Sequence, residues 1–217
     1  IDQSPRFLFK PLLYEFLSGE LQLWEVAPQY SSLASELGFI FLQECVVEVN
    51  ELERKLITSS KIELTFSQLV ISTGVETDYS FVKDLKKYAY GFSNLNDVLK
   101  IKNLITKINN SSQHTNPLVI SGAGPTGVEL ACKISDLLDH RIDIYLVDKA
   151  DKILSKSKSF NRDKAIAAIS NRNIKIYLEH FIKSIDETHL ELASNDINVN
   201  NSQKINYSSL IWTAGSK

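Results

Sequence analysis

Apolar residues in the first half of the chain occur in short runs that polar turns separate. The run FLFKPLLYEFLSG (7–19) predicts a short helix that begins near Pro11 and ends at Gly19. A second helix is predicted for SSLASEL, ended by Gly38, and strands for FIFLQECVVEVN, KLITS and KIELTFSQLVIST. Apolar positions at helical spacing then predict an amphipathic helix over 96–110.

The pattern changes after the polar stretch NNSSQHTN (109–116), which predicts a domain boundary. The run PLVIS predicts a buried strand, VELACKISDLLDH a helix and RIDIYLVD a second strand, so 117–148 predicts one βαβ unit. Further on, a helix is predicted over 164–170 and strands for IKIYLEHFIKSID, HLELAS and INYSSLIWTAG, with an irregular turn over 194–204. This order is typical of an α/β protein.

The composition is that of a globular protein, with 43% apolar and 23% charged residues among 217. A formal charge of −2 and scattered lysines argue against a nucleic-acid partner. No apolar run reaches the roughly 20 residues that span a bilayer. Cys45 and Cys132 lack CxxC or zinc-ligand spacing, so we expect both to be small buried residues. The chain starts at Ile1 and contains no methionine, which predicts an internal or processed piece.

A glycine motif carries the clearest chemistry, in the turn GAGPTG between a predicted strand and a predicted helix. A GxGxxG motif in this setting binds the pyrophosphate of a dinucleotide, since its glycines allow a tight turn and a close backbone approach. The helix start adds free N–H groups and the positive end of its dipole. The predicted pyrophosphate-binding residues are Gly122, Gly124, Pro125, Thr126 and Gly127.

Asp148 ends the next predicted strand, about 20 residues after the third glycine, where such proteins read the adenosine ribose. Its carboxylate can accept hydrogen bonds from the ribose hydroxyls and would repel a 2′-phosphate, which favours NAD(H) over NADP(H). Lys149 and Lys152 follow closely and would weaken that repulsion. We therefore include Lys149 among the predicted cofactor-binding residues.

Glu129 lies in the first turn of the predicted helix, where two interpretations stay open. A carboxylate at this place stabilises the helix dipole, which alone explains it. The residue also lies just past the glycine turn, on the side where a nicotinamide would extend. It is the one predicted catalytic residue.

A phrase occurs twice, as SQLVISTG at 67–74 and as SSLIWTAG at 208–215. It predicts two strands that each run to a glycine turn near a shared cofactor. Because the βαβ unit stands between the two copies, it is predicted to be inserted into another domain.

The segments FLFKPLLYEFLSGEL, LVISTG, GAGPTGVELA, YLVDKADKIL and LIWTAG together resemble the FAD-dependent pyridine nucleotide-disulfide oxidoreductase superfamily. The chain most resembles its type II NADH dehydrogenases, which are NADH:quinone oxidoreductases. The resemblance covers essentially the whole chain. It implies an α/β, two-dinucleotide-binding-domain flavoprotein fold, in which a Rossmann-like NAD domain is inserted into an incomplete FAD domain. The implied divisions are an FAD part (1–112), an NAD(H)-binding domain (113–207) and a return strand (208–217).

The resemblance also implies where two cofactors, FAD and NADH, would be held. Glu129 matches a family glutamate that lies between nicotinamide and flavin. Lys10 and Pro11 are implied to lie against the flavin ring, and Val46 is implied to meet the FAD adenine. Ser72, Thr73 and Gly74 would pass the FAD pyrophosphate and mark the first crossing between the domains. Ala214 and Gly215 would mark the return crossing.

The implied reaction is hydride transfer from NADH to FAD, followed by electron transfer to a quinone or another small acceptor. The implied location is the cytoplasmic side of a membrane, as a peripheral protein, and a homodimer stays open. The family's first GxGxxG, its flavin-binding Gly-Asp and its amphipathic membrane segment are not in these 217 residues. The alternatives are a soluble NAD(P)H-dependent flavoprotein reductase of another acceptor and a non-catalytic dinucleotide-binding protein.

Overall fold

The computed structural model describes residues 1–111, 116–195 and 202–215. The chain divides into two compact units, of which the first consists of Ile1–Leu12 and Gly19–Gly74. The second consists of Leu13–Ser18 and Val75–Lys217.

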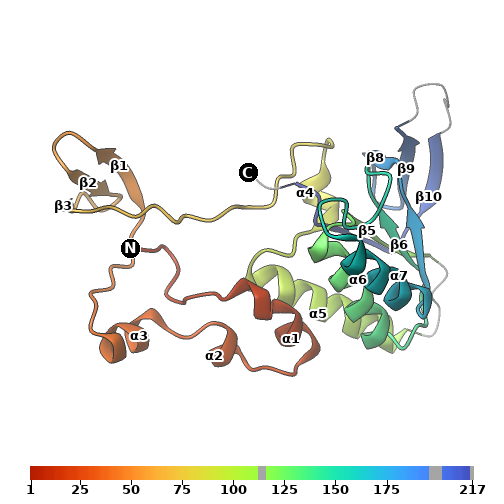
Figure 1. Cartoon of the computed structure of the whole chain (residues 1–217), viewed down its shortest axis with the longest axis horizontal. Helices are drawn as coiled ribbons and strands as arrows, with labels where there is room; N and C mark the ends of the chain where they lie inside the picture. Colours follow the sequence, from red (N-terminus) through yellow and green to blue (C-terminus); the bar gives the residue numbers. More distant parts are fainter. Residues whose placement is uncertain (112–115, 196–201, 216–217) are drawn as a thin grey trace. The chain divides into compact units, whose positions relative to one another are not determined.

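A five-stranded parallel sheet forms the centre of the second unit (Figure 1). All four residues of both β5 and β11 are buried, as expected for strands that are covered on both faces. The strand order is β4 (Ala89–Tyr90), β11 (Ser209–Trp212), β5 (Leu118–Ser121), β6 (Ile144–Val147) and β7 (Ile174–Tyr177). The predicted βαβ unit is therefore present as β5, α6 (Pro125–Leu137) and β6.

Helices pack along this sheet and against each other. Helix α6 contacts β5, β6 and β7, and it also packs against α7 (Ser159–Ser170) and α1 (Leu13–Ser18). Helix α5 (Leu95–Asn110) packs against α1 and β4, and the short α4 (Leu85–Tyr88) precedes β4. The predicted amphipathic helix is confirmed as α5, which buries Val98, Ile101, Leu104, Ile105 and Ile108.

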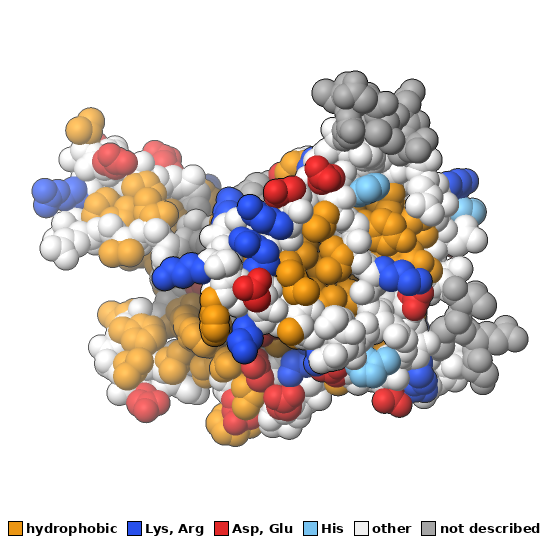
Figure 2. Space-filling view, turned by 45° about the vertical axis from the view of Figure 1, so that its right-hand side comes forward, with side chains coloured by type: hydrophobic (Ala, Val, Ile, Leu, Met, Phe, Trp, Pro, Cys, Tyr) orange, Lys and Arg blue, Asp and Glu red, His pale blue; other side chains and the backbone are white. Residues whose placement is uncertain are grey.

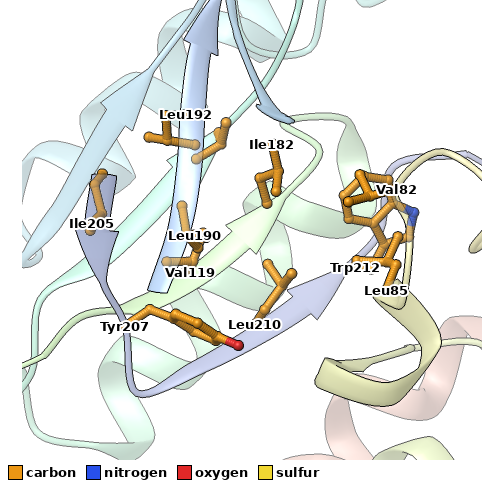
Figure 3. Close-up of a cluster of buried hydrophobic side chains, with 11 residues drawn as sticks. Val82, Leu85, Val119, Ile182, Leu190, Leu192, Ile205, Tyr207, Leu210 and Trp212 are labelled. Atoms are coloured by element: carbon orange, nitrogen blue, oxygen red, sulfur yellow. The ribbon is translucent and has the colours of Figure 1, made fainter. Parts of the chain in front are cut away.

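A three-stranded antiparallel sheet covers part of the parallel sheet. Its order is β10 (Ser202–Asn206), β9 (His189–Ser194) and β8 (His180–Ile185). Figure 3 shows Leu190, Leu192 and Ile182 of this sheet in one buried cluster with Val119 of β5 and Leu210 of β11. The alternation of side chains along β9 sends these leucines to the same face, where they close the core.

The first unit contains a small antiparallel sheet of β1 (Val46–Asn50), β2 (Lys55–Thr58) and β3 (Glu63–Thr65). Its helices are the 3₁₀ turn η1 (Lys10–Leu12), α2 (Leu23–Val26) and α3 (Tyr30–Leu37). Helix α3 ends as predicted at Gly38, which adopts the left-handed conformation with φ 73°. Tyr30 stacks on Phe41 with ring centroids 4.5 Å apart.

The prediction of a strand over 67–74 is wrong. These residues form no strand, and Val70 and Ile71 are 86% and 70% exposed. The second copy of the phrase does form a strand, because β11 is hydrogen-bonded to β4 on one side and β5 on the other. The same apolar pattern thus becomes a strand only where neighbouring strands pair with it.

The two compact units divide the chain between Gly74 and Val75. The boundary predicted at 109–116 lies later, and its residues 112–115 are outside the described ranges. Both β4 and α5 precede that boundary yet belong to the second unit, since β4 pairs with β11 and α5 packs on α1.

On the face that Figure 2 shows, lysine and arginine side chains are interspersed with acidic ones and with hydrophobic patches. Within the described ranges, no helix combines the length and the apolar character that crossing a membrane requires. The same residues contain no group of His, Cys, Asp and Glu suited to a metal ion.

Candidate functional site

A cavity of about 330 Å³ lies at the carboxyl ends of three parallel strands of the second unit. Ser121 ends β5, Val147 ends β6 and Trp212 ends β11, and all three line it. The chain leaves β5 toward β6 on one side, while β11 lies on the other, so the strand order reverses at β5. Open α/β sheets bind ligands in the crevice at such a reversal.

The glycine turn forms one wall of this cavity through Gly122, whose φ of 108° excludes most other residues. The Gly122 N–H donates to the Val147 carbonyl at 2.7 Å, which ties the turn to β6. A Cβ on Gly127 would overlap the Gly122 carbonyl oxygen. The first and third glycines are therefore required by the packing of the chain itself.

Gly124 differs from its two neighbours in the motif. Its φ of −73° is open to any residue, and an added Cβ would meet no atom within 4 Å. Contacts within the chain thus do not demand glycine here, whereas a phosphate approaching the backbone would. Pro125 is the first residue of α6, so N–H groups of the following turn point out of the helix end. These residues fit a pyrophosphate.

Asp148 follows β6 and lines the same cavity. One carboxylate oxygen accepts the Ala123 N–H at 2.5 Å and the other accepts the Ala150 N–H at 2.8 Å. The first bond ties the side chain to the glycine turn, and the second ties it to the loop after β6. Each carboxylate oxygen keeps a further lone pair, which can accept a hydrogen bond from a ribose hydroxyl.

Residues from the far end of the chain complete the cavity. Ala214 and Gly215 line it together with Lys149, so three of the predicted site segments meet in one place: the glycine turn, the residues after β6 and the residues after β11. Gly215 has a φ of 91°, and an added Cβ would lie 2.5 Å from the Phe81 ring. The Gly215 carbonyl accepts the Asp78 N–H at 3.3 Å.

Thr213 holds the ends of two strands together, a role that the sequence analysis missed. Its hydroxyl donates to the Ser121 carbonyl at 2.9 Å, and its N–H donates to the same oxygen at 2.8 Å. The threonine in the second copy of the repeated phrase thus joins β11 to β5. Only the pairing of these strands shows this role.

Thr126 and Glu129 lie in the first turns of α6, where α1 packs against this helix. The buried Tyr14 hydroxyl hydrogen-bonds to the Thr126 side chain, and burial raises the pKa of Tyr14 to about 12. Partial burial also raises the pKa of Glu129, with a further contribution from the Glu15 carboxylate. Glu129 is exposed and does not line the cavity.

The remaining predicted site residues lie in the first unit. A Cβ on Gly74 would be 4.0 Å from the Lys10 ammonium, so the structure brings these two residues together. Gly74 has a φ of 72°. Pro11 lies in η1, and Val46 begins β1 with 38% of its surface exposed. Ser72 and Thr73 precede Gly74 outside any strand.

The two cysteines, Cys45 and Cys132, are partly buried and unpaired, which is less burial than the sequence predicted. Burial raises the pKa of the Cys132 thiol. A thiol that is harder to ionise is a weaker nucleophile, so the structure gives Cys132 no activated role.

The parallel sheet, the glycine turn before α6 and the cavity over the strand ends define a dinucleotide-binding α/β protein. The family model for pyridine nucleotide-disulphide oxidoreductases matches residues 2–217. The chain belongs to this family.

Two relatives and one solved structure show how the chain compares. Demethylphylloquinone reductase NdbB of Synechocystis is 33% identical, over 99% of this chain and 53% of that protein. The alternative NAD(P)H-ubiquinone oxidoreductase C1 of Arabidopsis thaliana is 29% identical, over 100% of this chain and 46% of that protein. The chain spans about half the length of these relatives.

The solved structure is that of NDH2 from Plasmodium falciparum in complex with NADH. It superimposes with a TM-score of 0.84, over 99% of this chain and 49% of that one, at 22% identity. This likeness shows that the two chains share a fold.

Proposed function

We propose that this chain belongs to an NADH:quinone oxidoreductase, in which electrons pass from NADH through FAD to a quinone. The observation that carries the proposal is the cavity over β5, β6 and β11, beside a glycine turn in which only Gly124 has no structural need to be glycine. The names of the two relatives, a demethylphylloquinone reductase and an NAD(P)H-ubiquinone oxidoreductase, support a quinone as acceptor.

NADH would be held by the residues that meet at this cavity. The N–H groups at the start of α6 would bind its pyrophosphate beside Gly124, and Asp148 would accept the ribose hydroxyls. In domain terms, we propose that 113–207 form the NAD(H)-binding part, while 1–112 and the return strand 208–217 contribute to an FAD-binding domain.

FAD would be held by the residues that the family resemblance indicates. The proximity of the Lys10 ammonium to Gly74 supports part of this assignment, since it places a positive charge beside a glycine residue with positive φ in the first unit. The proposed FAD contacts are Lys10, Pro11, Val46, Ser72, Thr73 and Gly74, while Ala214 and Gly215 would mark the return crossing beside the NADH cavity. When bound, the two cofactors supply the hydride chemistry, and the chain supplies binding and orientation.

Glu129 is the proposed catalytic residue, as a group that holds a proton beside the nicotinamide. Partial burial, with a smaller contribution from the neighbouring Glu15 carboxylate, raises its pKa, so it keeps its proton to higher pH than an ordinary glutamate. Tyr14 supports the helix start by its hydrogen bond to Thr126.

The binding step is tested by titrating the purified chain with NADH and following the NADH fluorescence. We expect saturable binding, which Asp148→Ala weakens because the ribose loses its acceptor and the glycine turn loses the hydrogen bond from Ala123. Lys107→Gln, a change in the last turn of α5, is a matched control that should bind as the wild type does. Absence of saturable binding would refute the proposed nucleotide site.

The reaction is tested on the protein purified with bound flavin. NADH should bleach the flavin absorbance under anaerobic conditions, and a water-soluble quinone should restore it. A colourless protein that still binds NADH would rule out the enzyme and favour a non-catalytic dinucleotide-binding protein.

We propose a peripheral contact with the cytoplasmic face of a membrane, on the model of the family. Sedimentation with lipid vesicles tests this contact. A homodimer is a further proposal, which sedimentation velocity tests directly.

A further inference from the structure

Three side chains from separate segments meet at the cavity, and the dinucleotide motif does not account for two of them. The Lys149 ammonium lies 5.9 Å from the centroid of the Phe81 ring and 5.3 Å from that of the Phe181 ring. Phe81 precedes α4, Lys149 follows β6 and Phe181 belongs to β8. All three line the cavity, so the cation is flanked by two aromatic rings inside it.

Phe81 has a fixed place although its side chain is 57% exposed. Its ring occupies the space where residue 215 would carry a Cβ, at 2.5 Å from that position. It also lies near the Trp212 ring, with centroids 6.2 Å apart. The end of β11 therefore positions Phe81, and Phe81 in turn positions Lys149.

The charge of Lys149 is not compensated by a neighbouring carboxylate in the way that other cavity charges are. Among the described residues Lys149 has no ion pair, whereas Lys183, which lines the same cavity, pairs with Glu191 at 3.0 Å. The Asp148 carboxylate is already bound by two backbone N–H groups. Aromatic faces attract an ammonium group through their π electrons and offer no oxygen or nitrogen acceptor for its hydrogen bonds. The three N–H donors of the ammonium therefore stay available to an anion.

We propose that Phe81 and Phe181 hold Lys149 as a phosphate-binding residue, so that the cavity accepts the 2′-phosphate of NADPH as well as the free ribose of NADH. This inference rests on the proposed function, in which Asp148 faces the same ribose. Lys149 is adjacent to Asp148 in the chain, which places a cation beside the one carboxylate found among the described residues that line the cavity. Phe81 is then a positioning residue for cofactor specificity.

The test measures the dissociation constants of NADH and NADPH for the purified chain. We expect the wild-type values to agree within about tenfold, because a single charge-assisted hydrogen bond is sufficient to offset one repulsion. Lys149→Gln should weaken NADPH binding about tenfold and leave NADH binding nearly unchanged, while Lys149→Arg should keep NADPH binding. Phe81→Leu should weaken NADPH binding selectively but less, since the cation stays and only its position is lost.

Lys152→Gln is the matched control, because Lys152 follows Lys149 by three residues but lies 4.0 Å from the Asp151 carboxylate and does not line the cavity. It should change neither constant. Equal weakening of both nucleotides by Lys149→Gln, or wild-type binding of NADH without NADPH, would overturn the inference and leave the proposed function standing. Failure to bind NADH at all would overturn both.

Discussion

Gly124 and Gly127, at the start of α6, should respond differently to substitution by alanine, and this contrast is the sharpest test of the site. In Gly127→Ala the new methyl group would overlap the Gly122 carbonyl oxygen and lie 2.9 Å from the Thr213 hydroxyl. In Gly124→Ala the methyl group would have no neighbour within 4 Å. The first change should therefore destabilise the fold, and the second should affect only a bound ligand.

The magnitudes follow from these contacts. Overpacking costs about 1–3 kcal/mol, and for Gly127→Ala we expect the upper end because backbone atoms cannot rotate away. At a helical position alanine is about 1 kcal/mol more favourable than glycine, so the net loss in the free energy of unfolding should be about 2 kcal/mol. For Gly124→Ala, a poorer N-cap costs about 0.5–1 kcal/mol, and the reduced entropy of the unfolded chain offsets about 0.4–1 kcal/mol. Its net effect should lie near zero.

Urea denaturation followed by tryptophan fluorescence measures both effects. Trp212 reports on the cavity, and a Trp24→Phe background removes the exposed tryptophan of the other unit. Gly127→Ala should lower the midpoint by roughly 1 M, given a slope of about 2 kcal/mol/M. Gly124→Ala should keep the midpoint and bind NADH at least about tenfold more weakly, because a methyl group displaces the pyrophosphate from the backbone.

Wild-type stability of Gly127→Ala would refute the packing argument. Wild-type NADH affinity of Gly124→Ala would refute the placement of the pyrophosphate. The two results are independent, since the first concerns the chain alone and the second concerns its ligand.

Four further predictions concern side chains around α6. Glu15→Gln should lower the pKa of Glu129, measured by carboxyl NMR, because it removes a neighbouring negative charge; an unchanged value would contradict that coupling. Since the folded state raises the Glu129 pKa, its protonation stabilises the fold at acidic pH, and this contribution should vanish as pH rises through the raised pKa. The pKa of Asp136 is lowered by its hydrogen bond with Arg172, at 2.7 Å. The stabilising effect of this pair should therefore be lost as pH falls through the lowered pKa. In urea denaturation at different pH values, Asp136→Asn should make the free energy of unfolding less dependent on pH in the acid range. The Tyr14 hydroxyl should resist ionisation until about pH 12 in an absorbance titration, and Tyr14→Phe should remove that step.

The local pattern of the sequence was sufficient for the βαβ unit. A buried apolar run, a glycine turn and an amphipathic run are each decided by neighbouring residues, so β5, α6 and β6 formed where the sequence predicted them. The same is true of α5 and of the turn at Gly38, whose left-handed conformation favours glycine.

The repeated phrase shows where local pattern is insufficient. Residues 67–74 and 208–215 have nearly the same order of apolar and polar residues, yet only the second contains a strand. A strand needs hydrogen-bonding partners, and β4 and β5 supply them to β11. Periodicity along one segment contains no information about which other segments lie beside it.

The candidate site divides in the same way. The sequence was sufficient to predict Gly122, Gly124, Gly127 and Asp148 as site residues, because they belong to one continuous motif whose spacing is typical of dinucleotide binding. Only the tertiary structure decided that Phe81 would lie against Gly215 and that its ring would flank Lys149. These contacts join segments far apart in the chain, and their geometry is set by the pairing of whole strands rather than by any local preference.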